Sequence, residues 1–176
     1  MNEDNRNVTD EFRGMSVDDI KTSLDRRRQP LQVAVENVTR DFNMGTIVRN
    51  ANAFNVSMIH VIGRRQWNKR GAMATDKYMH IVYHASVADF VASMAGTHII
   101  GIDNIEGSVP LASTTLPRDA VLVFGSESDG LSDDMAAACE QIIAIEQFGS
   151  TRSVNVGVAS GIAMYAWLQQ HTFSTM

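Results

Sequence analysis

The chain has 176 residues, 44% of them hydrophobic and 20% charged, a composition typical of one globular domain that excludes long disorder and collagen-like repeats. Its formal net charge is −5, and its single cysteine, Cys139, excludes an internal disulfide and a zinc site built from cysteines. The polar residues 1–10 predict no secretory signal, no apolar run reaches the roughly 18 residues of a membrane span, and a reducing, cytoplasmic compartment is expected.

The hydrophobic pattern predicts strands that alternate with helices. Ser16 can cap the first helix, since Asp19 follows three residues later, and Pro30 ends it. This order predicts an α/β fold, with a mostly parallel sheet covered by helices on both faces. Residues 1–30 are expected to form a tail with a short basic helix, and residues 31–176 a single domain. The later strands are predicted at 31–35, 58–62, 80–84, 98–102, 121–124 and 142–145, and the later helices at 43–54, 87–94, 132–139 and 154–170.

Positive charge is concentrated in one part of the chain. Residues 1–77 hold 13 Lys and Arg against 10 Asp and Glu, whereas residues 78–176 hold 2 against 10. Because salt screens a charge within about 10 Å, a basic stripe on an acidic body can still bind phosphates. The triplet Arg26, Arg27 and Arg28 either belongs to such a stripe or is only the solvated end of the first helix.

The last predicted helix lies in a segment, 153–176, that holds no Asp, Glu, Lys or Arg. A helix with so little polar surface must be covered on nearly all sides. Its small residues Gly157, Ser160, Gly161 and Ala163 permit another backbone to approach closely. The helix is therefore either a central core helix or one that packs on the sheet and on a second subunit. The second alternative is favoured, because one small domain offers few surfaces to cover both faces.

Three polar segments follow or end predicted strands, where open α/β sheets bind ligands. They are NMGTIVRNA at 43–51, VFGSESDGLS at 123–132 and IEQFGSTRSVNVGVA at 145–159. None of them is a dinucleotide-binding glycine motif, a P-loop or a serine nucleophile elbow. His80 and His84 lie in a predicted strand and do not form a helical metal pair, so no metal site is expected.

In this order, the three segments resemble the motifs of the SpoU/TrmH family of SPOUT RNA methyltransferases. They match N-x-G-x-x-x-R, G-(S/P)-E-x-x-G-L and, with Glu146 in place of the proline, I-P-x-x-G-x-x-x-S-x-N-V, and the resemblance covers residues 31–170. It implies a deep C-terminal trefoil knot and transfer of a methyl group from S-adenosylmethionine to a ribose 2'-hydroxyl of tRNA or rRNA. It also implies a homodimer, formed through the C-terminal helix and the knot face, whose active sites take residues from both subunits.

Residue by residue, the resemblance implies that Arg49 is catalytic and that Asn43, Glu127, Ser153 and Asn155 support it. The methyl donor is expected in the knot, between the loops 102–107, 125–131 and 145–155. The residues expected to bind it are Ile102, Gly125, Ser126, Leu131, Ile145, Gln147 and Val154.

The role of Arg49 has two interpretations. Family accounts make the arginine the base that takes the proton of the 2'-hydroxyl, although a free guanidinium stays protonated up to a pKa above about 12. Alternatively, Arg49 holds the adjacent phosphate and stabilises the developing alkoxide charge. The sulfonium already activates the methyl group, so the enzyme mainly aligns the reacting atoms.

RNA contacts are expected from the basic residues near the second strand. Arginines beside an aromatic ring suit phosphate contact and base stacking, although Trp67 can equally be a packing residue. Glu146 stands where many relatives have proline and is expected at the rim of the donor pocket, and Gly157 stands where many have serine. The residues expected to bind RNA are Arg26, Arg27, Arg28, Arg64, Arg65, Trp67, Lys69 and Arg70.

The function predicted from the sequence is therefore an RNA 2'-O-ribose methyltransferase. Because no separate RNA-binding domain fits in the first 30 residues, tRNA is favoured over rRNA. The alternatives are a catalytically silent RNA-binding module that keeps the fold, and a member of the same superfamily that methylates bases.

Overall fold

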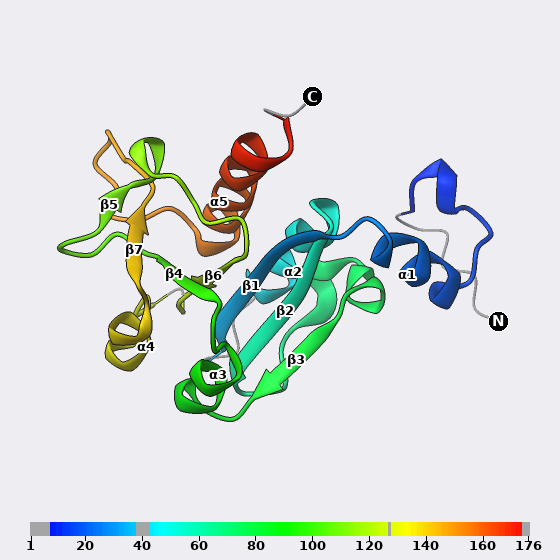
Figure 1. Ribbon diagram of the computed structural model, residues 1–176, viewed down its shortest axis with the longest axis horizontal. Helices are drawn as coiled ribbons and strands as arrows, with labels where there is room; N and C mark the ends of the chain where they lie inside the picture. The colour runs from blue at the N-terminus through cyan, green and yellow to red at the C-terminus, as the bar shows by residue number, and fades with distance from the viewer. Residues whose placement is uncertain (1–7, 38–42, 127, 174–176) are drawn as a thin grey trace.

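The computed structural model describes residues 8–37, 43–126 and 128–173. Seven strands form one sheet in the order β3-β2-β1-β6-β4-β7-β5, and its neighbouring strands run parallel (Figure 1). The strands are β1 (Gln29–Asn37), β2 (Val56–Gly63), β3 (Ile81–His84), β4 (His98–Ile102), β5 (Val109–Pro110), β6 (Ala120–Phe124) and β7 (Gln141–Ala144). The α-helices are α1 (Val17–Asp25), α2 (Asn43–Ala53), α3 (Val87–Ser93), α4 (Asp133–Ala138) and α5 (Val156–His171), and the short 3-10 helices are η1 (Asp10–Phe12), η2 (Lys69–Ala72), η3 (Thr75–Tyr78) and η4 (Leu111–Ser113).

Helices cover both faces of the sheet, as predicted. Side chains alternate along a strand, so Val33 and Val35 of β1 point to one face and Ala34 points to the other. The first face packs against α2 and α5 in the larger core cluster. The second packs against α3 and α4, where Phe90 and Met135 are fully buried. The mostly parallel α/β prediction is therefore confirmed.

The predicted strands and helices agree with the structure to within a few residues, because capping residues mark several of their ends. Ser16, Ser86 and Ser132 each accept a hydrogen bond from the backbone N–H three residues later and so begin α1, α3 and α4. The strand β5 was not predicted, since two residues carry no periodicity. The strand order does not test the trefoil knot, which stays a prediction.

Among the residues that the structure describes, the long helix α5 packs against the rest of the chain through one face. Ala163, Met164 and Trp167 are fully buried against the sheet. On the opposite side, Val158 is 54% exposed and Tyr165 is 47% exposed. Among the described residues, α5 is therefore not covered on all sides as a central core helix would be, and an apolar face of it is exposed to solvent.

The N-terminal segment packs at the end of the sheet where β1 begins, and α1 extends away from it (Figure 1). Its contacts include a small apolar cluster formed by Phe12, Ile20 and Tyr78. The arginine triplet follows the end of α1, whose own residues are mainly acidic and apolar, so the helix itself is not basic. The domain boundary at residue 30 stays a prediction.

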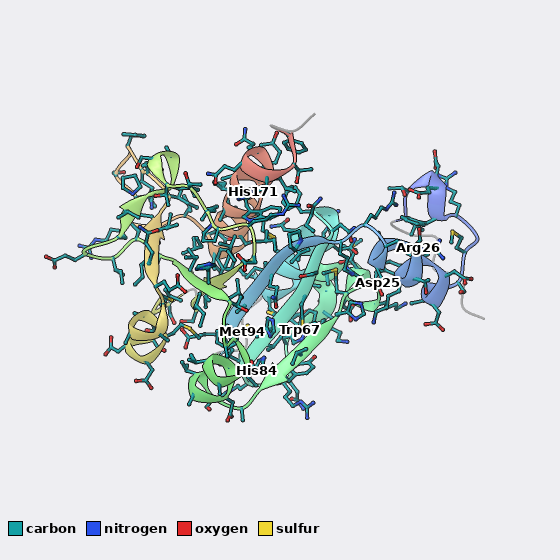
Figure 2. The ribbon with its side chains drawn as sticks, viewed as in Figure 1. Asp25, Arg26, Trp67, His84, Met94 and His171 are labelled. Atoms are coloured by element: carbon teal, nitrogen blue, oxygen red, sulfur yellow. The ribbon has the colours of Figure 1, made fainter. Side chains whose placement is uncertain are left out.

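A hydrogen-bonded chain of polar side chains crosses the strands β1, β2 and β3, with both of its histidines buried and Gln32 half-buried. His60 Nδ1 lies 2.9 Å from His84 Nε2, and His60 Nε2 lies 2.8 Å from Gln32 Oε1. The ring of Phe90 from α3 packs edge-on against both imidazoles, and Figure 2 shows His84 beside this helix. These histidines are structural, as expected for His84. In the described ranges, no helix is long and apolar enough to cross a bilayer.

Candidate functional site

A cleft of about 460 Å³ opens where the loops after β4, β6 and β7 meet. These loops leave the carboxyl ends of neighbouring parallel strands, which is the edge at which α/β sheets bind ligands. Residues from all three loops and from the start of α5 line it: Ile102, Asp103, Asn104, Ile105, Gly125, Ser126, Ser128, Asp129, Gly130, Ile145, Gln147, Arg152, Ser153, Val154, Asn155, Val156 and Ala159.

The structure brings six of the seven residues predicted to bind the cofactor to this cleft. Leu131 does not line it, because its side chain is buried with the core cluster on the α3 and α4 side of the sheet. Ser153 and Asn155, predicted as catalytic supports, also line the cleft. Glu127 lies outside the described residues.

The glycine-rich loop after β6 folds back on itself. Ser126 and Gly130 exchange two backbone hydrogen bonds of 3.0 Å each, and Gly130 has a positive φ of 70°. A side chain at Gly125 would overlap the backbone of Gly130. Both glycines are therefore required by the shape of the loop.

Asp103 fixes this loop from the end of β4. One carboxylate oxygen accepts a hydrogen bond of 2.8 Å from the Leu131 N–H, and the other accepts one of 2.7 Å from the Asn104 N–H. The side chain lies in the cleft wall. The sequence does not single out Asp103, because a lone acidic residue in a loop carries no signal of its partners.

Glu36, at the end of β1, supports the same loop, and the sequence did not predict it as a site residue either. Its side chain is only 5% exposed at the end of β1, and its oxygens accept from the Ser132 N–H at 2.9 Å and from Ser132 Oγ at 2.7 Å. Ser132 in turn caps α4. The loop is thus held between two carboxylates that accept its backbone N–H groups.

The third loop joins the first across the rim of the cleft. Asn104 Nδ2 donates a hydrogen bond of 3.0 Å to the Arg152 carbonyl. Within the described part of the chain, Gln147 Oε1 is buried and has no hydrogen-bond partner. An acceptor left unpaired in a cleft wall costs free energy unless a ligand donates to it.

Glu146 does not line the cleft. Its Oε1 accepts a hydrogen bond of 3.0 Å from the Ala112 N–H, which ties the loop to η4. The expectation that this departure from proline forms the pocket rim is therefore not supported by the position of its side chain.

Asn155 connects the cleft to the first motif. Its Oδ1 accepts from the backbone N–H groups of Gly157 and Val158 and so caps α5. Its Nδ2 donates a hydrogen bond of 2.9 Å to Asn43 Oδ1 at the start of α2. Two predicted site residues that are far apart in the sequence are thereby in direct contact.

Arg49 lies on α2, six residues after Asn43, which is about 9 Å along the helix axis. Its side chain is exposed and does not line the cleft of its own chain. It follows Gly45 by four residues and therefore shares its face of the helix. The basic connection after β2 crosses α2 at Gly45, about one helical turn before Arg49.

This crossing is very close. A Cβ atom at Gly45 would lie 2.7 Å from the Ala72 N and 2.8 Å from the Gly71 Cα. The backbone of η2 therefore rests directly on the first turn of α2. As a result, Lys69 and Arg70 of η2 belong to a segment that packs on the helix that carries Arg49.

Four of the predicted RNA-binding side chains in this region are exposed: Arg64, Arg65, Lys69 and Arg70. The Arg65 guanidinium lies 4.9 Å from the centre of the Tyr83 ring. Lys69 Nζ forms a 2.8 Å ion pair with Asp76, and this hydrogen bond raises the pKa of Lys69. Trp67 is half-buried and packs against the larger core cluster, which favours its interpretation as a packing residue.

The arginine triplet divides into different roles. Arg28 is a structural residue, because its guanidinium donates to the Val56 and Tyr78 carbonyls and pairs with Asp25, and its side chain is only 7% exposed. The expectation that Arg28 contacts RNA is therefore corrected. Arg26 and Arg27 are exposed, and Figure 2 shows Arg26 beside Asp25 at the end of α1.

Comparison with known proteins gives matches along most of the chain. A model of the SpoU rRNA Methylase family matches residues 30–165. The tRNA (guanosine(18)-2'-O)-methyltransferase of Escherichia coli strain K12 is 26% identical over 147 residues, which are 81% of this chain and 64% of that protein. This chain therefore spans less than two thirds of the length of that relative.

Two solved structures are similar in fold. One, from a study of the 2-OH methylation of C/U34 on tRNA, has a TM-score of 0.73 at 25% identity, and the match covers 81% of this chain and 97% of that one. The other, an AdoMet-bound rRNA methyltransferase from Sinorhizobium meliloti, has a TM-score of 0.72 at 25% identity, with coverage of 84% and 60%.

Proposed function

The chain belongs to the SpoU rRNA methylase family, and we propose that it transfers a methyl group from S-adenosylmethionine to a ribose 2'-hydroxyl of tRNA or rRNA. One observation carries this proposal. The hydrogen bond between Asn43 and Asn155 joins the motif that contains Arg49 to the wall of the cleft. The first residue of this motif therefore lies at the cleft, and Arg49 lies about 9 Å further along α2.

The cleft fits the methyl donor in size and chemistry. Its volume of about 460 Å³ is in the range of small-molecule sites. The buried, unpaired Oε1 of Gln147 can accept a hydrogen bond from an amino group of the donor. The similar Sinorhizobium meliloti structure contains AdoMet. When bound, S-adenosylmethionine supplies a methyl group already activated by its positively charged sulfur.

The residues of the chain then orient the acceptor: its oxygen would take the methyl group as the bond to sulfur breaks, S-adenosylhomocysteine would be released, and the hydroxyl proton would pass to solvent water. Arg49 can hold the phosphate next to the target ribose with its fork of N–H donors. The same charge stabilises the oxygen of the 2'-hydroxyl as its proton leaves. Asn43 is held by Asn155 and positions the start of the helix that carries Arg49. Alignment of this kind is worth about 7–11 kcal/mol in well-oriented reactions.

We further propose that the complete site needs two copies of the chain. Arg49 does not line the cleft of its own chain, although the proposed reaction brings it to the methyl donor. The exposed apolar face of α5, with Val158, Ile162 and Tyr165 between 40% and 54% exposed, provides a surface for a second copy. A twofold arrangement through α5 would place each Arg49 near the cleft of the partner subunit.

For the RNA, we propose tRNA over rRNA and a site of action in the cytoplasm. The match covers 97% of the structure from the study of tRNA C/U34 methylation, so that chain has no large part beyond the match. The exposed arginines Arg64, Arg65 and Arg70, on the connection that crosses α2, can contact phosphates on either side of the target nucleotide.

The proposal is tested by methyl transfer from labelled S-adenosylmethionine to unmodified total tRNA and, separately, to rRNA. We expect Arg49→Ala to lower transfer at least 100-fold while S-adenosylmethionine binding, measured by calorimetry, is unchanged, because Arg49 acts on the RNA and not on the donor. Arg49→Lys is the matched variant: it keeps the charge but not the planar fork, and we expect partial activity.

Digestion of the labelled RNA identifies the product. A 2'-O-methylated nucleoside supports the proposal. A nucleoside methylated on its base would instead show that the enzyme methylates bases. Donor and RNA binding without transfer in the wild-type chain would support the silent binding module instead. Equal loss of donor binding and transfer in Arg49→Ala would show that the role of Arg49 is wrong.

A further inference from the structure

A second cavity, of about 490 Å³, lies where the N-terminal segment meets the ends of α2 and α5. It is partly outside the region matched by the family model, since seven residues of the N-terminal segment line it: Val8, Thr9, Glu11, Phe12, Ile20, Leu24 and Arg27. We propose that this cavity binds one unstacked nucleobase of the RNA substrate, an inference that rests on the proposed RNA methyltransferase function.

The walls of the cavity are rich in aromatic rings. Phe12 comes from the N-terminal segment, Tyr78 from η3, Phe54 from the end of α2 and Phe173 from the residues after α5. Phe12 and Tyr78 are buried, whereas Phe173 is 45% exposed. Proteins bind unstacked bases of single-stranded RNA by stacking them on such rings.

A rigid cation forms part of the same wall. Arg27 donates two hydrogen bonds, of 3.0 and 2.9 Å, to the two carboxylate oxygens of Glu11, and its guanidinium lies 5.4 Å from the centre of the Phe12 ring. This planar group is thus held in place and can stack on a base. Arg26 next to it is exposed and can contact a phosphate.

The cavity also has a polar wall. Asn52 lines it from α2, and its Oδ1 is buried without a hydrogen-bond partner among the described residues. An amide group both donates and accepts, as the edge of a base does. If the Asn52 side chain turned toward a ligand, its Oδ1 would lose no hydrogen bond to the described residues. The combination of stacking rings and an amide is the chemistry of base recognition, not that of a purely apolar docking groove.

The position of the cavity connects it to the site of methyl transfer. Asn52 and Ala53 follow Arg49 by three and four residues, so they lie one helical turn away on a neighbouring part of the α2 surface. An RNA strand whose phosphate is held by Arg49 therefore passes the mouth of the cavity. A base close to the target ribose can enter it, which would give the enzyme a preference for that base.

The first test fills the cavity from its exposed edge. Ala53 is exposed and lines the cavity, so Ala53→Phe places a ring in it without disturbing the core. We expect RNA binding and kcat/KM to fall about 10- to 100-fold, the effect of losing one stacked base, with unchanged S-adenosylmethionine binding. Ala92→Phe, at an exposed position of α3 on the other face of the sheet, is the matched control.

The second test needs no catalysis. Single nucleoside monophosphates are titrated into the labelled protein with the cofactor cleft saturated by S-adenosylhomocysteine. We expect one of the four to shift the NMR signal of the Asn52 side-chain amide in the wild type and not in Ala53→Phe. We also expect Asn52→Leu to reduce the preference among the four.

The outcomes separate this inference from the proposed function. Wild-type methyl transfer together with unchanged RNA binding in Ala53→Phe, and no shift at Asn52, would overturn the base site and leave the methyltransferase intact. A change of oligomeric state in Ala53→Phe, seen by light scattering, would show that a second copy of the chain fills the cavity, which also overturns the proposal.

Discussion

Asp103 and Glu36 show how single acidic side chains can shape a binding cleft without reacting. Each accepts hydrogen bonds from loop N–H groups, at Leu131 and Ser132 respectively. These contacts depend on the fold-back of the loop at Gly130, which brings residues distant in the sequence together. The residue types of the motifs therefore predicted the location of the cleft, but not the carboxylates that fix its loops.

His60 makes the free energy of unfolding depend on pH. Burial, together with a smaller effect of the neighbouring His84, lowers the pKa of His60 to about 4. Since the unfolded chain has a histidine pKa near 6.5, it binds more protons than the folded chain between pH 6.5 and 4. We expect the free energy of unfolding to fall by about 3 kcal/mol as the pH falls through this window, measured by urea denaturation.

The matched variant for this prediction is His60→Gln, which keeps a side chain able to hydrogen-bond but removes the titrating group. We expect its stability to fall less steeply from pH 6.5 to 4 than that of the wild type. Equal pH slopes in the two proteins would contradict the prediction, whatever their absolute stabilities.

At the scale of elements, hydrophobic periodicity and caps were sufficient to predict the main helices and strands. The packing of the connection after β2 was not predictable, because it depends on two backbones meeting at Gly45 and Gly71. Nothing in the sequence near Gly71 shows which helix it will touch. The same holds for Arg28, whose guanidinium reaches carbonyls at Val56 and Tyr78, far along the chain.

The close crossing predicts a strong effect of one added methyl group. Gly45→Ala should lower the free energy of unfolding by about 1–3 kcal/mol, or several degrees in Tm, because its Cβ would meet backbone atoms that cannot rotate away. Thermal denaturation measures this. Gly149→Ala is the control, since a Cβ there has no heavy atom within 4 Å, and we expect Tm to stay within the error of the wild type.

The same connection should carry part of the RNA interface. Replacing Arg64 and Arg65 together by alanine should reduce the slope of log K against log salt by about 1 for each phosphate that the two side chains neutralise. RNA binding measured from low to moderate salt gives this slope. Arg118→Ala, an exposed arginine in the acidic part of the chain, should leave it unchanged. An unaltered slope in the double variant would place the RNA elsewhere.

For the whole molecule, the proposed division of the site between two subunits has a direct test. Ser153 is exposed in the cleft, so Ser153→Phe should block it, whereas Arg49→Ala leaves the cleft open. Each variant alone should be inactive. In a purified heterodimer, the open cleft of the Arg49→Ala chain meets the intact Arg49 of the Ser153→Phe chain, whereas the other cleft is blocked. One of the two sites is then complete, and we expect about half of the wild-type methyl transfer.

The control adds Tyr165→Glu to both chains. A buried charge at the exposed face of α5 opposes association, so no heterodimer and no recovered activity are expected. If the mixed dimer forms but stays inactive, Arg49 acts within its own chain. The lack of charge in 153–176 predicted a partner for this helix, but only the structure shows which face is left open.

The hydrogen-bonded chain from Gln32 through His60 to His84 offers an internal reporter for the half of the sheet away from the cleft. A proton on these ring nitrogens exchanges with solvent when α3, whose Phe90 covers both imidazoles, moves off this face of the sheet and admits water. Its exchange rate in heavy water therefore measures how often this half opens. The cleft lies at the ends of the strands β4, β6 and β7. Comparing this exchange rate with and without a bound donor therefore reveals whether donor binding at one half of the sheet changes how often the other half opens.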